Sequence, residues 1–258
     1  MPRNRPIASS PRLSIVIPAY NEEARLPGAL ARLQTFLADK PYPWEILVVS
    51  NGSTDRTAQV VRKAMSSLAG LQLIILEQRG KGVASRTGVL QARGEIVFLC
   101  DADLSMPPET IDRFLPLLQQ TDVVIGSREA SGARRYGEPR HRHVMGRVFN
   151  RLVQLLAVPG VEDTQCGFKA FRRTTAEDIF RRQTITGFAF DVEVLFLARK
   201  LGYRMQELGI DWYFDADSRV RPGYDSLTMF REVIGVRVRS LLGRYNRPFP
   251  ITARGRDV

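Results

Sequence analysis

Two aspartates separated by one residue, Asp101 and Asp103, directly follow the apolar run Ile-Val-Phe-Leu-Cys at residues 96–100. Two carboxylates this close together are costly to hold unless a cation neutralises them. Mg²⁺ and Mn²⁺ take oxygen ligands from carboxylates, and Mg²⁺ completes its shell with water and substrate phosphates. The pair therefore predicts a site for Mg²⁺ or Mn²⁺ that holds a nucleotide diphosphate. Because Asp-x-Asp also occurs in ordinary surface loops, this prediction depends on where the pair lies in the fold.

The first half of the chain alternates short β-branched runs with helical stretches, as parallel strands joined by crossover helices do. Strands are expected at 13–17, 45–49, 72–76, 95–99 and 122–125, and helices near 22–37, 54–68 and 82–92. Right-handed crossovers then give an open, doubly wound α/β sheet with helices on both faces. Ligands of such sheets bind beyond the carboxyl ends of the strands, which is where Asp101 and Asp103 fall.

Other polar residues follow the neighbouring strands. The first strand runs into Pro18, Tyr20 and Glu22, and the second runs into Asn51. Tyr20 offers a ring on which a base could stack, although a tyrosine in an ordinary turn looks the same in sequence. After the third strand, residues 79–82 (Arg-Gly-Lys-Gly) open a helix, which predicts a phosphate-binding loop with anion-facing amides. The absence of a Walker sequence and of GxGxxG removes support for kinases and dinucleotide-dependent dehydrogenases.

The charge of the chain is concentrated in two stretches. Its 258 residues carry a formal charge of +11, of which residues 128–151 contribute +5 and residues 219–258 contribute +6, almost entirely as arginine. Because guanidinium groups grip phosphate oxygens, this indicates a phosphate ligand or an anionic surface, with a merely solubilising face as the alternative. Tyr136 and Phe149 are too few aromatic residues in the first stretch for a nucleic-acid stacking platform, so no nucleic acid is expected as a partner.

Several features concern the cellular location. Cys100 and Cys166 are the only cysteines, which favours a reducing, cytoplasmic compartment. No apolar run has the length of a signal peptide core or of a membrane span. Apolar residues between Leu227 and Leu241 recur at helical spacing with arginines between them, and a second stripe runs from Val148 to Leu156. Such a helix could lie on an anionic membrane surface or pack on the core with its arginines outward. We expect a cytoplasmic protein, peripheral at the inner face of the membrane.

Seven segments carry a resemblance to a known family. They occur in order between residues 13 and 198: IVIPAYNEE, VVSNGSTDRT, RGKG, DADLS, VIGSR, DTQCGFKAF and FDVEVLFLA. Together they resemble glycosyltransferase family 2, which has the GT-A fold, and within it the dolichyl-phosphate β-glucosyltransferases and their prokaryotic polyprenyl-phosphate relatives. The resemblance implies an inverting hexosyltransferase that moves glucose from UDP-glucose onto polyprenyl or dolichyl phosphate. A soluble or glycan hydroxyl acceptor is the alternative.

The sequence and the resemblance together assign roles to individual residues. Donor binding falls to Pro18, Tyr20, Glu22, Asn51, Lys81, Asp101, Ala102 and Asp103. Acceptor phosphate binding falls to Arg128, Arg140, Arg147, Ser218 and Arg219. The expected catalytic residues are Asp101, Asp103, Arg128 and Asp191. The family usually has an acidic pair where this chain has Ser50-Asn51, so the Asn51 side-chain oxygen is expected to accept a hydrogen bond from uracil. Ser105, where mannose-transferring relatives often have Gln, favours a glucose-like sugar.

The acceptor decides whether a base is needed. A lipid phosphate is already an anionic nucleophile, so arginines need only position it, whereas a hydroxyl acceptor would need a base such as Asp191. With a phosphate acceptor, Asp191 and Glu193 are expected to orient sugar hydroxyls or arginines, or to cap a helix.

The chain is expected to form one GT-A domain over residues 12–245, between a disordered basic tail at 1–11 and a second tail at 246–258. We divide it into a nucleotide-sugar half (12–127), an acceptor half (128–224) and an amphipathic basic helix (225–245). An oligomer or a membrane-protein partner could also help to deliver the acceptor.

Overall fold

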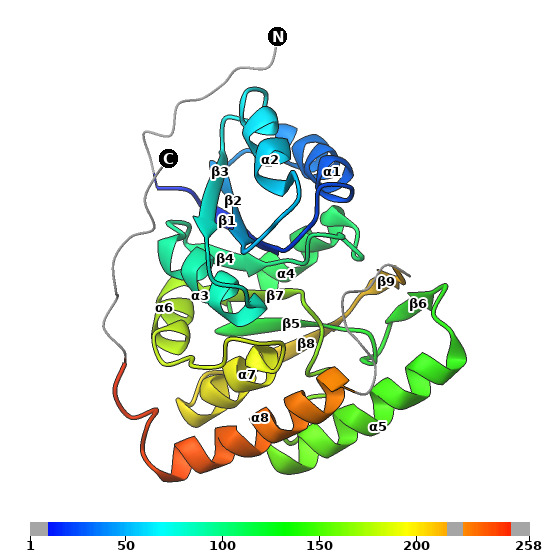
Figure 1. The fold of residues 1–258 in the computed structure, drawn as a ribbon, viewed down its shortest axis with the longest axis vertical. Helices are drawn as coiled ribbons and strands as arrows, with labels where there is room; N and C mark the ends of the chain where they lie inside the picture. Colours follow the sequence, from blue (N-terminus) through cyan, green and yellow to red (C-terminus); the bar gives the residue numbers. More distant parts are fainter. Residues whose placement is uncertain (1–9, 216–223, 249–258) are drawn as a thin grey trace.

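The computed structural model describes residues 10–215 and 224–248 (Figure 1). Its central feature is a seven-stranded sheet in the order β3-β2-β1-β4-β7-β5-β8. The strands are β1 (Leu13–Ala19), β2 (Trp44–Asn51), β3 (Leu71–Leu76), β4 (Ile96–Leu99), β5 (Val123–Ser127), β7 (Lys169–Arg172) and β8 (Met205–Gly209). All neighbours are parallel except β7, which runs antiparallel to both β4 and β5. A small separate sheet pairs β6 (Arg134–Tyr136) with β9 (Asp211–Tyr213).

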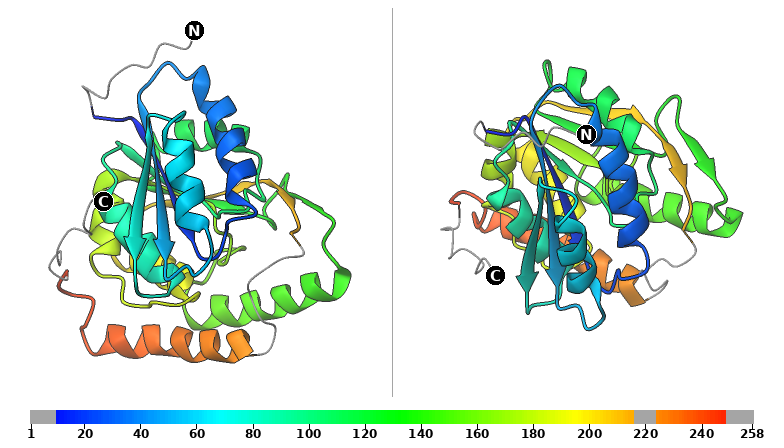
Figure 2. Two further views of the ribbon diagram at one scale, coloured as in Figure 1. Left: turned by 45° about the horizontal axis from the view of Figure 1, so that its top comes forward. Right: turned by 90° about the horizontal axis from the view of Figure 1, so that it is seen from above.

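Helices cover both faces of the large sheet (Figure 2). One face carries α1 (Leu26–Ala38), α2 (Thr57–Met65), the 3₁₀ helix η1 (Pro108–Thr110) and α4 (Ile111–Leu117). The other carries α3 (Lys81–Gln91), α6 (Arg173–Phe180) and α7 (Phe190–Lys200). Two long helices, α5 (Arg140–Leu156) and α8 (Tyr224–Leu241), lie side by side outside α7. The predicted α/β class, mostly parallel with helices on both faces, is confirmed.

The central strands form because their residues suit burial on two faces. Every residue of β1 is buried, as expected for a parallel strand between two layers of helices. The polar Ser14 within it is satisfied, since its hydroxyl donates to Glu45 of β2 over 2.6 Å, and Arg93 pairs with the same carboxylate at 2.8 Å. The core is thus divided by the sheet into two apolar layers that hold the strand ends in fixed positions.

The five predicted strands correspond to β1–β5, and the three predicted helices are found as α1–α3: α1 begins later than predicted, α2 is shorter, and α3 lies within one residue of its predicted bounds. The first helix begins at Leu26, with Pro27 in its first turn, where a missing backbone amide is tolerated. The cysteines Cys100 and Cys166 are buried and free. Within the described residues, no helix is both long enough and apolar enough to cross a bilayer.

Candidate active site

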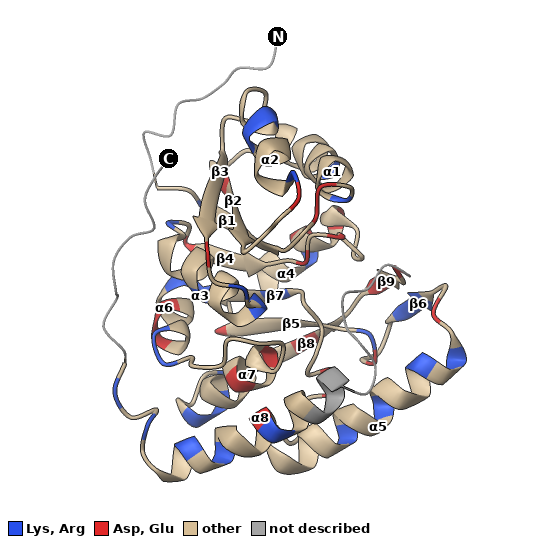
Figure 3. Ribbon diagram, viewed as in Figure 1, with Lys and Arg blue, Asp and Glu red and all other residues tan. Residues whose placement is uncertain are grey.

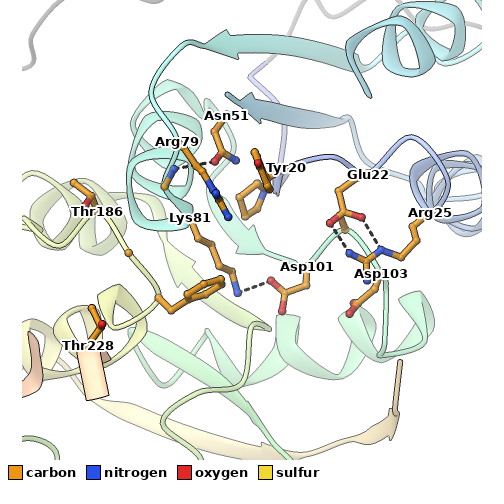
Figure 4. Close-up of a pocket in the computed structure, with 15 residues that line it drawn as sticks. Tyr20, Glu22, Arg25, Asn51, Arg79, Lys81, Asp101, Asp103, Thr186 and Thr228 are labelled. Atoms are coloured by element: carbon orange, nitrogen blue, oxygen red, sulfur yellow. Dashed lines mark hydrogen bonds and ion pairs between the residues drawn. The ribbon is translucent and has the colours of Figure 1, made fainter. Parts of the chain in front are cut away.

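A pocket of about 710 Å³ opens at the carboxyl ends of β1, β2 and β4, beside the start of α3 (Figure 4). All eight residues expected to bind the donor line it: Pro18, Tyr20, Glu22, Asn51, Lys81, Asp101, Ala102 and Asp103. Arg79 and Gly80, from the predicted glycine-rich loop, also line it, and five further lining residues were not predicted: Arg25, Thr186, Gly187, Phe188 and Thr228. Strand-end positions from the first half of the chain therefore meet a wall that comes from the second half.

A tight turn after β4 presents the two aspartates. The amide of Leu104 donates to the carbonyl of Asp101 over 3.2 Å, and the amide of Ser105 donates to the Asp103 carboxylate over 3.0 Å. Leu104 has a left-handed backbone (φ 46°), which is costly for a residue with a branched side chain, yet this side chain is buried. Packing therefore holds a strained turn that keeps both carboxylates at the pocket.

The two carboxyls differ in their electrostatic surroundings. Burial raises the pKa of Asp101, but the Lys81 ammonium, 2.7 Å from Oδ1, outweighs it and the net shift is downward. Burial also raises the pKa of Asp103, and there the neighbouring charge of Asp101 adds to the effect, so the net shift is upward. Lys81 thus stabilises the negative charge of Asp101, whereas the negative charge of Asp103 has no comparable stabilisation.

A divalent cation would supply the compensation that Asp103 lacks, so the residues present fit a metal site. Within the described ranges, no group of three or more His, Cys, Asp or Glu side chains is arranged so that it could hold a metal ion. A metal held by Asp101 and Asp103 would therefore take its other ligands from the substrate phosphates and water.

Gly167 lies directly behind Asp101. A Cβ atom added at Gly167 would lie 1.9 Å from the Asp101 Oδ2 atom, so any side chain here would displace the carboxylate. The preceding Cys166 is buried, and burial raises the pKa of its thiol to about 12, which suits a packed residue and not a nucleophile. The segment before β7 therefore serves as the back wall of the aspartate site.

The glycine-rich loop at 79–82 differs from the phosphate-binding loop that the sequence predicted. The amide of Gly80 donates to the Asn51 Oδ1 atom over 3.0 Å, and the amide of Gly82 donates to the Thr186 carbonyl over 2.9 Å. A Cβ at Gly82 would lie 2.1 Å from the Ile185 carbonyl. The expectation that these two amides face a phosphate is therefore wrong, because the glycines allow close packing against residues 185–186. Lys81 is the part of the loop that reaches Asp101.

Asn51 and Tyr20 are also engaged by protein groups. Besides accepting from Gly80, the Asn51 amide donates to the Ala19 carbonyl over 2.9 Å, so it ties the β1 and β2 ends to the glycine loop. A uracil N–H would have to share the oxygen that Gly80 already uses. The guanidinium of Arg79 lies over the Tyr20 ring, 4.1 Å from its centroid. Tyr20 is therefore half of a cation–π pair at the pocket wall.

Glu22 forms an ion pair that the sequence did not indicate. Arg25 contacts both Glu22 oxygens, at 2.6 and 2.5 Å, and a third nitrogen lies 2.9 Å from Asp215. This arginine joins the first strand loop to the last described residue before the gap at 216–223. It therefore links the two halves of the chain at the edge of the pocket.

Of the residues expected to bind the acceptor phosphate, the three that the structure describes, Arg128, Arg140 and Arg147, are not among those that line the pocket. The guanidinium of Arg128, which is expected to bind the acceptor phosphate, makes a two-pronged ion pair with Asp163 at 2.7 and 2.8 Å. Arg147 pairs with Glu129 at 2.5 Å on α5, and Arg140 is the exposed first residue of that helix. Ser218 and Arg219 lie outside the described residues.

Asp191 and Glu193 lie in the first turn of α7. The Asp191 Oδ1 atom lies 2.6 Å from the ammonium of the fully buried Lys169, and its Oδ2 lies 3.9 Å from that of Lys81. Burial raises the pKa of Asp191, and the charges of Lys169 and Lys81 oppose that rise without cancelling it. Neither acid caps the helix, whose N-cap residue is Ala189.

Glu193 supports the pocket wall and is not among the described residues that line the pocket. It is fully buried and accepts hydrogen bonds from the amides of Thr184 and Ile185 at 2.9 and 2.7 Å. Of the two roles expected for it, orienting sugar hydroxyls or arginines, the structure shows an arginine contact, since the Arg239 Nε atom lies 4.0 Å from the Glu193 Oε1 atom. Glu193 fixes the segment that leads to Thr186 and the glycine loop.

The model of glycosyl transferase family 2 matches residues 14–180. The chain belongs to this family. The dolichyl-phosphate beta-glucosyltransferase of Dictyostelium discoideum is 35% identical over 246 residues, covering 90% of this chain and 75% of the relative. The enzyme of the same name from Drosophila melanogaster is 36% identical over 255 residues, covering 90% of this chain and 76% of the relative. The protein is therefore a glycosyltransferase.

Solved structures confirm the GT-A fold of this glycosyltransferase. Glucosyl-3-phosphoglycerate synthase from Mycobacterium tuberculosis, in complex with Mn²⁺ and UDP-glucose, matches with a TM-score of 0.62 at 22% identity, covering 94% of this chain and 81% of that protein. Mannosyl-3-phosphoglycerate synthase from Rubrobacter xylanophilus matches with a TM-score of 0.64 at 20% identity, covering 95% and 79%. The doubly wound sheet predicted from sequence is thus the scaffold of this fold.

Proposed function

We propose that this glycosyltransferase moves a glucosyl group from UDP-glucose onto a dolichyl or polyprenyl phosphate, giving a β-linked lipid-phosphate sugar. The observation that carries the proposal is the Asp101–Asp103 pair, which lies at a strand end in a pocket beside Lys81. The substrate assignment is supported by the relatives at 35% and 36% identity, both named dolichyl-phosphate beta-glucosyltransferase.

The donor diphosphate binds at the carboxyl end of β4. Asp101 and Asp103 would hold Mg²⁺ or Mn²⁺, and the bound ion would stabilise the charge of the leaving diphosphate. Lys81 lies 2.7 Å from Asp101 and adds a second positive charge to the same corner of the pocket. The Tyr20 and Arg79 pair provides a flat wall for the nucleoside.

A phosphate acceptor explains the state of Asp191 better than a hydroxyl acceptor does. A hydroxyl needs a base within hydrogen-bond reach, whereas a phosphate is already ionised. Asp191 is buried, bonded to Lys169, and outside the group of described residues that line the pocket. We therefore assign it to positioning Lys169 and Lys81, and we favour the lipid phosphate over a soluble or glycan hydroxyl.

The test is transfer of radiolabelled glucose from UDP-glucose to polyprenyl phosphate in detergent with Mg²⁺ present. We expect a lipid-soluble product with a β anomeric signal, and its loss when EDTA is added. Asp103→Asn should lower kcat by at least about 100-fold, as loss of one preorganised electrostatic group does in other enzymes. Asp112→Asn, a surface aspartate paired with Lys40, is the matched control and should be unchanged. Equal turnover by Asp103→Asn, or transfer only to soluble hydroxyls, would contradict the proposal.

A further inference from the structure

The exposed apolar surface of the described residues is concentrated on two helices. Nine of the thirteen large apolar side chains that are exposed there belong to α5, to α8 or to the residue after α8. On α5 they are Val144, Met145, Val148, Leu152 and Leu155, the last of which is 79% exposed. Their spacing of three and four residues places four of them on one stripe. A helix that faces water normally shows polar residues there.

The second helix repeats the pattern. Ile234, Val238 and Leu241 follow one another at helical spacing on α8, and all three are exposed, Leu241 at 88%. Helix α8 packs against the rest of the protein through its opposite side, where Val233 and Val236 are fully buried. The outward stripe is therefore additional to the packing face. Since α5 and α8 lie side by side, the two stripes belong to one region of the molecule (Figure 2).

Arginines accompany these stripes (Figure 3). Arg140 and Arg151 on α5, and Arg231 and Arg237 on α8, are exposed. The α5 sequence contains no Asp or Glu. On α8, Glu232 is half-buried and accepts a hydrogen bond from the backbone of Ala189, so it turns toward α7 and not toward the outer face. Apolar residues flanked by arginines are the composition of helices that lie at the surface of an anionic bilayer.

The helix pair also leads to the pocket. Thr228 of α8 lines the donor pocket, and the helix runs from there along α5 (Figure 1). A lipid whose phosphate reaches the pocket would thus have its chain beside an apolar surface. A second copy of the protein fits this face less well, because self-association would bring arginines against arginines.

We propose that the outward faces of α5 and α8 form a docking surface for an anionic phospholipid bilayer. This proposal extends the proposed function. It rests on that function in one respect, namely that the acceptor is a membrane lipid. The apolar stripes enter the boundary between headgroups and chains, and the arginines contact lipid phosphates. Each exposed arginine contributes about a five-fold increase in affinity, which corresponds to about 1 kcal/mol per basic residue near such a surface.

The test is flotation of the full chain with vesicles of phosphatidylcholine alone and of phosphatidylcholine mixed equally with phosphatidylglycerol. We expect binding to the anionic vesicles that weakens with salt. The double variant Val148→Asp/Val238→Asp should lose at least about ten-fold in binding, because two charges would enter the apolar boundary. The matched control is Met65→Asp/Ile75→Asp, which changes two exposed apolar residues on α2 and β3 and should bind as the unaltered protein does.

Activity separates this proposal from the proposed function. The Val148→Asp/Val238→Asp variant should still glucosylate a short, water-soluble isoprenyl phosphate, which also proves that it folds, and should lose transfer to a long-chain acceptor in vesicles. Vesicle binding by the unaltered protein without any glucosyl transfer would contradict the proposed function and would still support the docking surface. Unchanged vesicle binding by the double variant would overturn the docking surface. So would a dimer in light scattering that the same substitutions dissociate.

Discussion

The hydroxyl of Tyr245, four residues after the end of α8, donates a 2.6 Å hydrogen bond to the carboxylate of Glu193 in α7. Both side chains are buried, and Arg239 of α8 donates to the same hydroxyl over 3.0 Å. Because Glu193 also holds the amides of Thr184 and Ile185, the segment after α8 is joined to the wall of the donor pocket through one carboxylate.

Tyr245→Phe should test this connection. The ring stays in place while the donor is lost, so the free energy of unfolding should fall by about 2 kcal/mol, as for other hydrogen bonds to charged groups. Loosening of residues 184–186 should raise KM for the nucleotide sugar several-fold with a smaller change in kcat. Chemical denaturation and initial rates measure the two effects.

Tyr203→Phe provides the control for that variant. The Tyr203 hydroxyl also donates to a carboxylate, that of Asp178 at 2.9 Å, but this pair lies outside the pocket lining among the described residues. Its removal should lower stability and leave KM unchanged. If both variants raised KM equally, the link through Glu193 would have no special role.

Gly167→Ala should damage the site without damaging the fold. The added methyl group would lie within 1.9 Å of the Asp101 Oδ2 atom, so the carboxylate must move away from its position beside Lys81. We expect kcat to fall by about 100-fold, since small displacements of catalytic groups have effects of this size. Gly28→Ala in α1, where nothing lies within 4 Å of the new atom, should keep full activity. Wild-type activity of Gly167→Ala would show that the Asp101 position is not critical.

The strand-end residues of the pocket could be predicted from sequence because they directly follow strands. Alternating apolar runs determine where β1, β2 and β4 end, and parallel strands bring those ends to one edge of the sheet. Tyr20, Asn51 and Asp101 therefore had to be neighbours. The local sequence pattern is sufficient to predict the location of such residues.

The rest of the site depends on contacts between distant segments. Arg25 pairs with Asp215 across 190 residues, and Thr186 reaches the pocket through close packing on Gly80 and Gly82. Strand β7 was not predicted, because it has only four residues and begins with a lysine, a residue that is rarely buried unless paired. This lysine, Lys169, forms an ion pair with Asp191 of α7, and no local sequence pattern identifies that pairing.

Asn51→Asp would restore an acidic residue of the kind that family members usually carry after the second strand, and should be harmful here. The Asn51 amide both accepts from Gly80 and donates to the Ala19 carbonyl, and a carboxylate can only accept. The Ala19 carbonyl would lose its donor and face a negative charge. We expect a loss of about 1 to 3 kcal/mol in the free energy of unfolding, measured by denaturant titration. Asn246→Asp, at an exposed position after α8, should leave the free energy of unfolding unchanged. If Asn51→Asp also left it unchanged, the two hydrogen bonds of Asn51 would not be important for stability.

The Arg128–Asp163 pair predicts a pH dependence of stability. Burial raises the pKa of Asp163, but the charge of Arg128 outweighs it and lowers the pKa to about 2, below the ordinary value of an aspartate. Because the folded pKa is depressed, the ionised pair stabilises the protein above about pH 4, and this contribution is lost as the pH falls toward 2. The shift corresponds to about 2 kcal/mol. Asp163→Asn should therefore be strongly destabilised at pH 7, with a deficit relative to the unaltered protein that narrows between pH 4 and pH 2. Urea unfolding at each pH measures this difference in the free energy of unfolding. A difference that stays constant between pH 4 and pH 2 would show that the charge of the Asp163 carboxylate is not what stabilises Arg128.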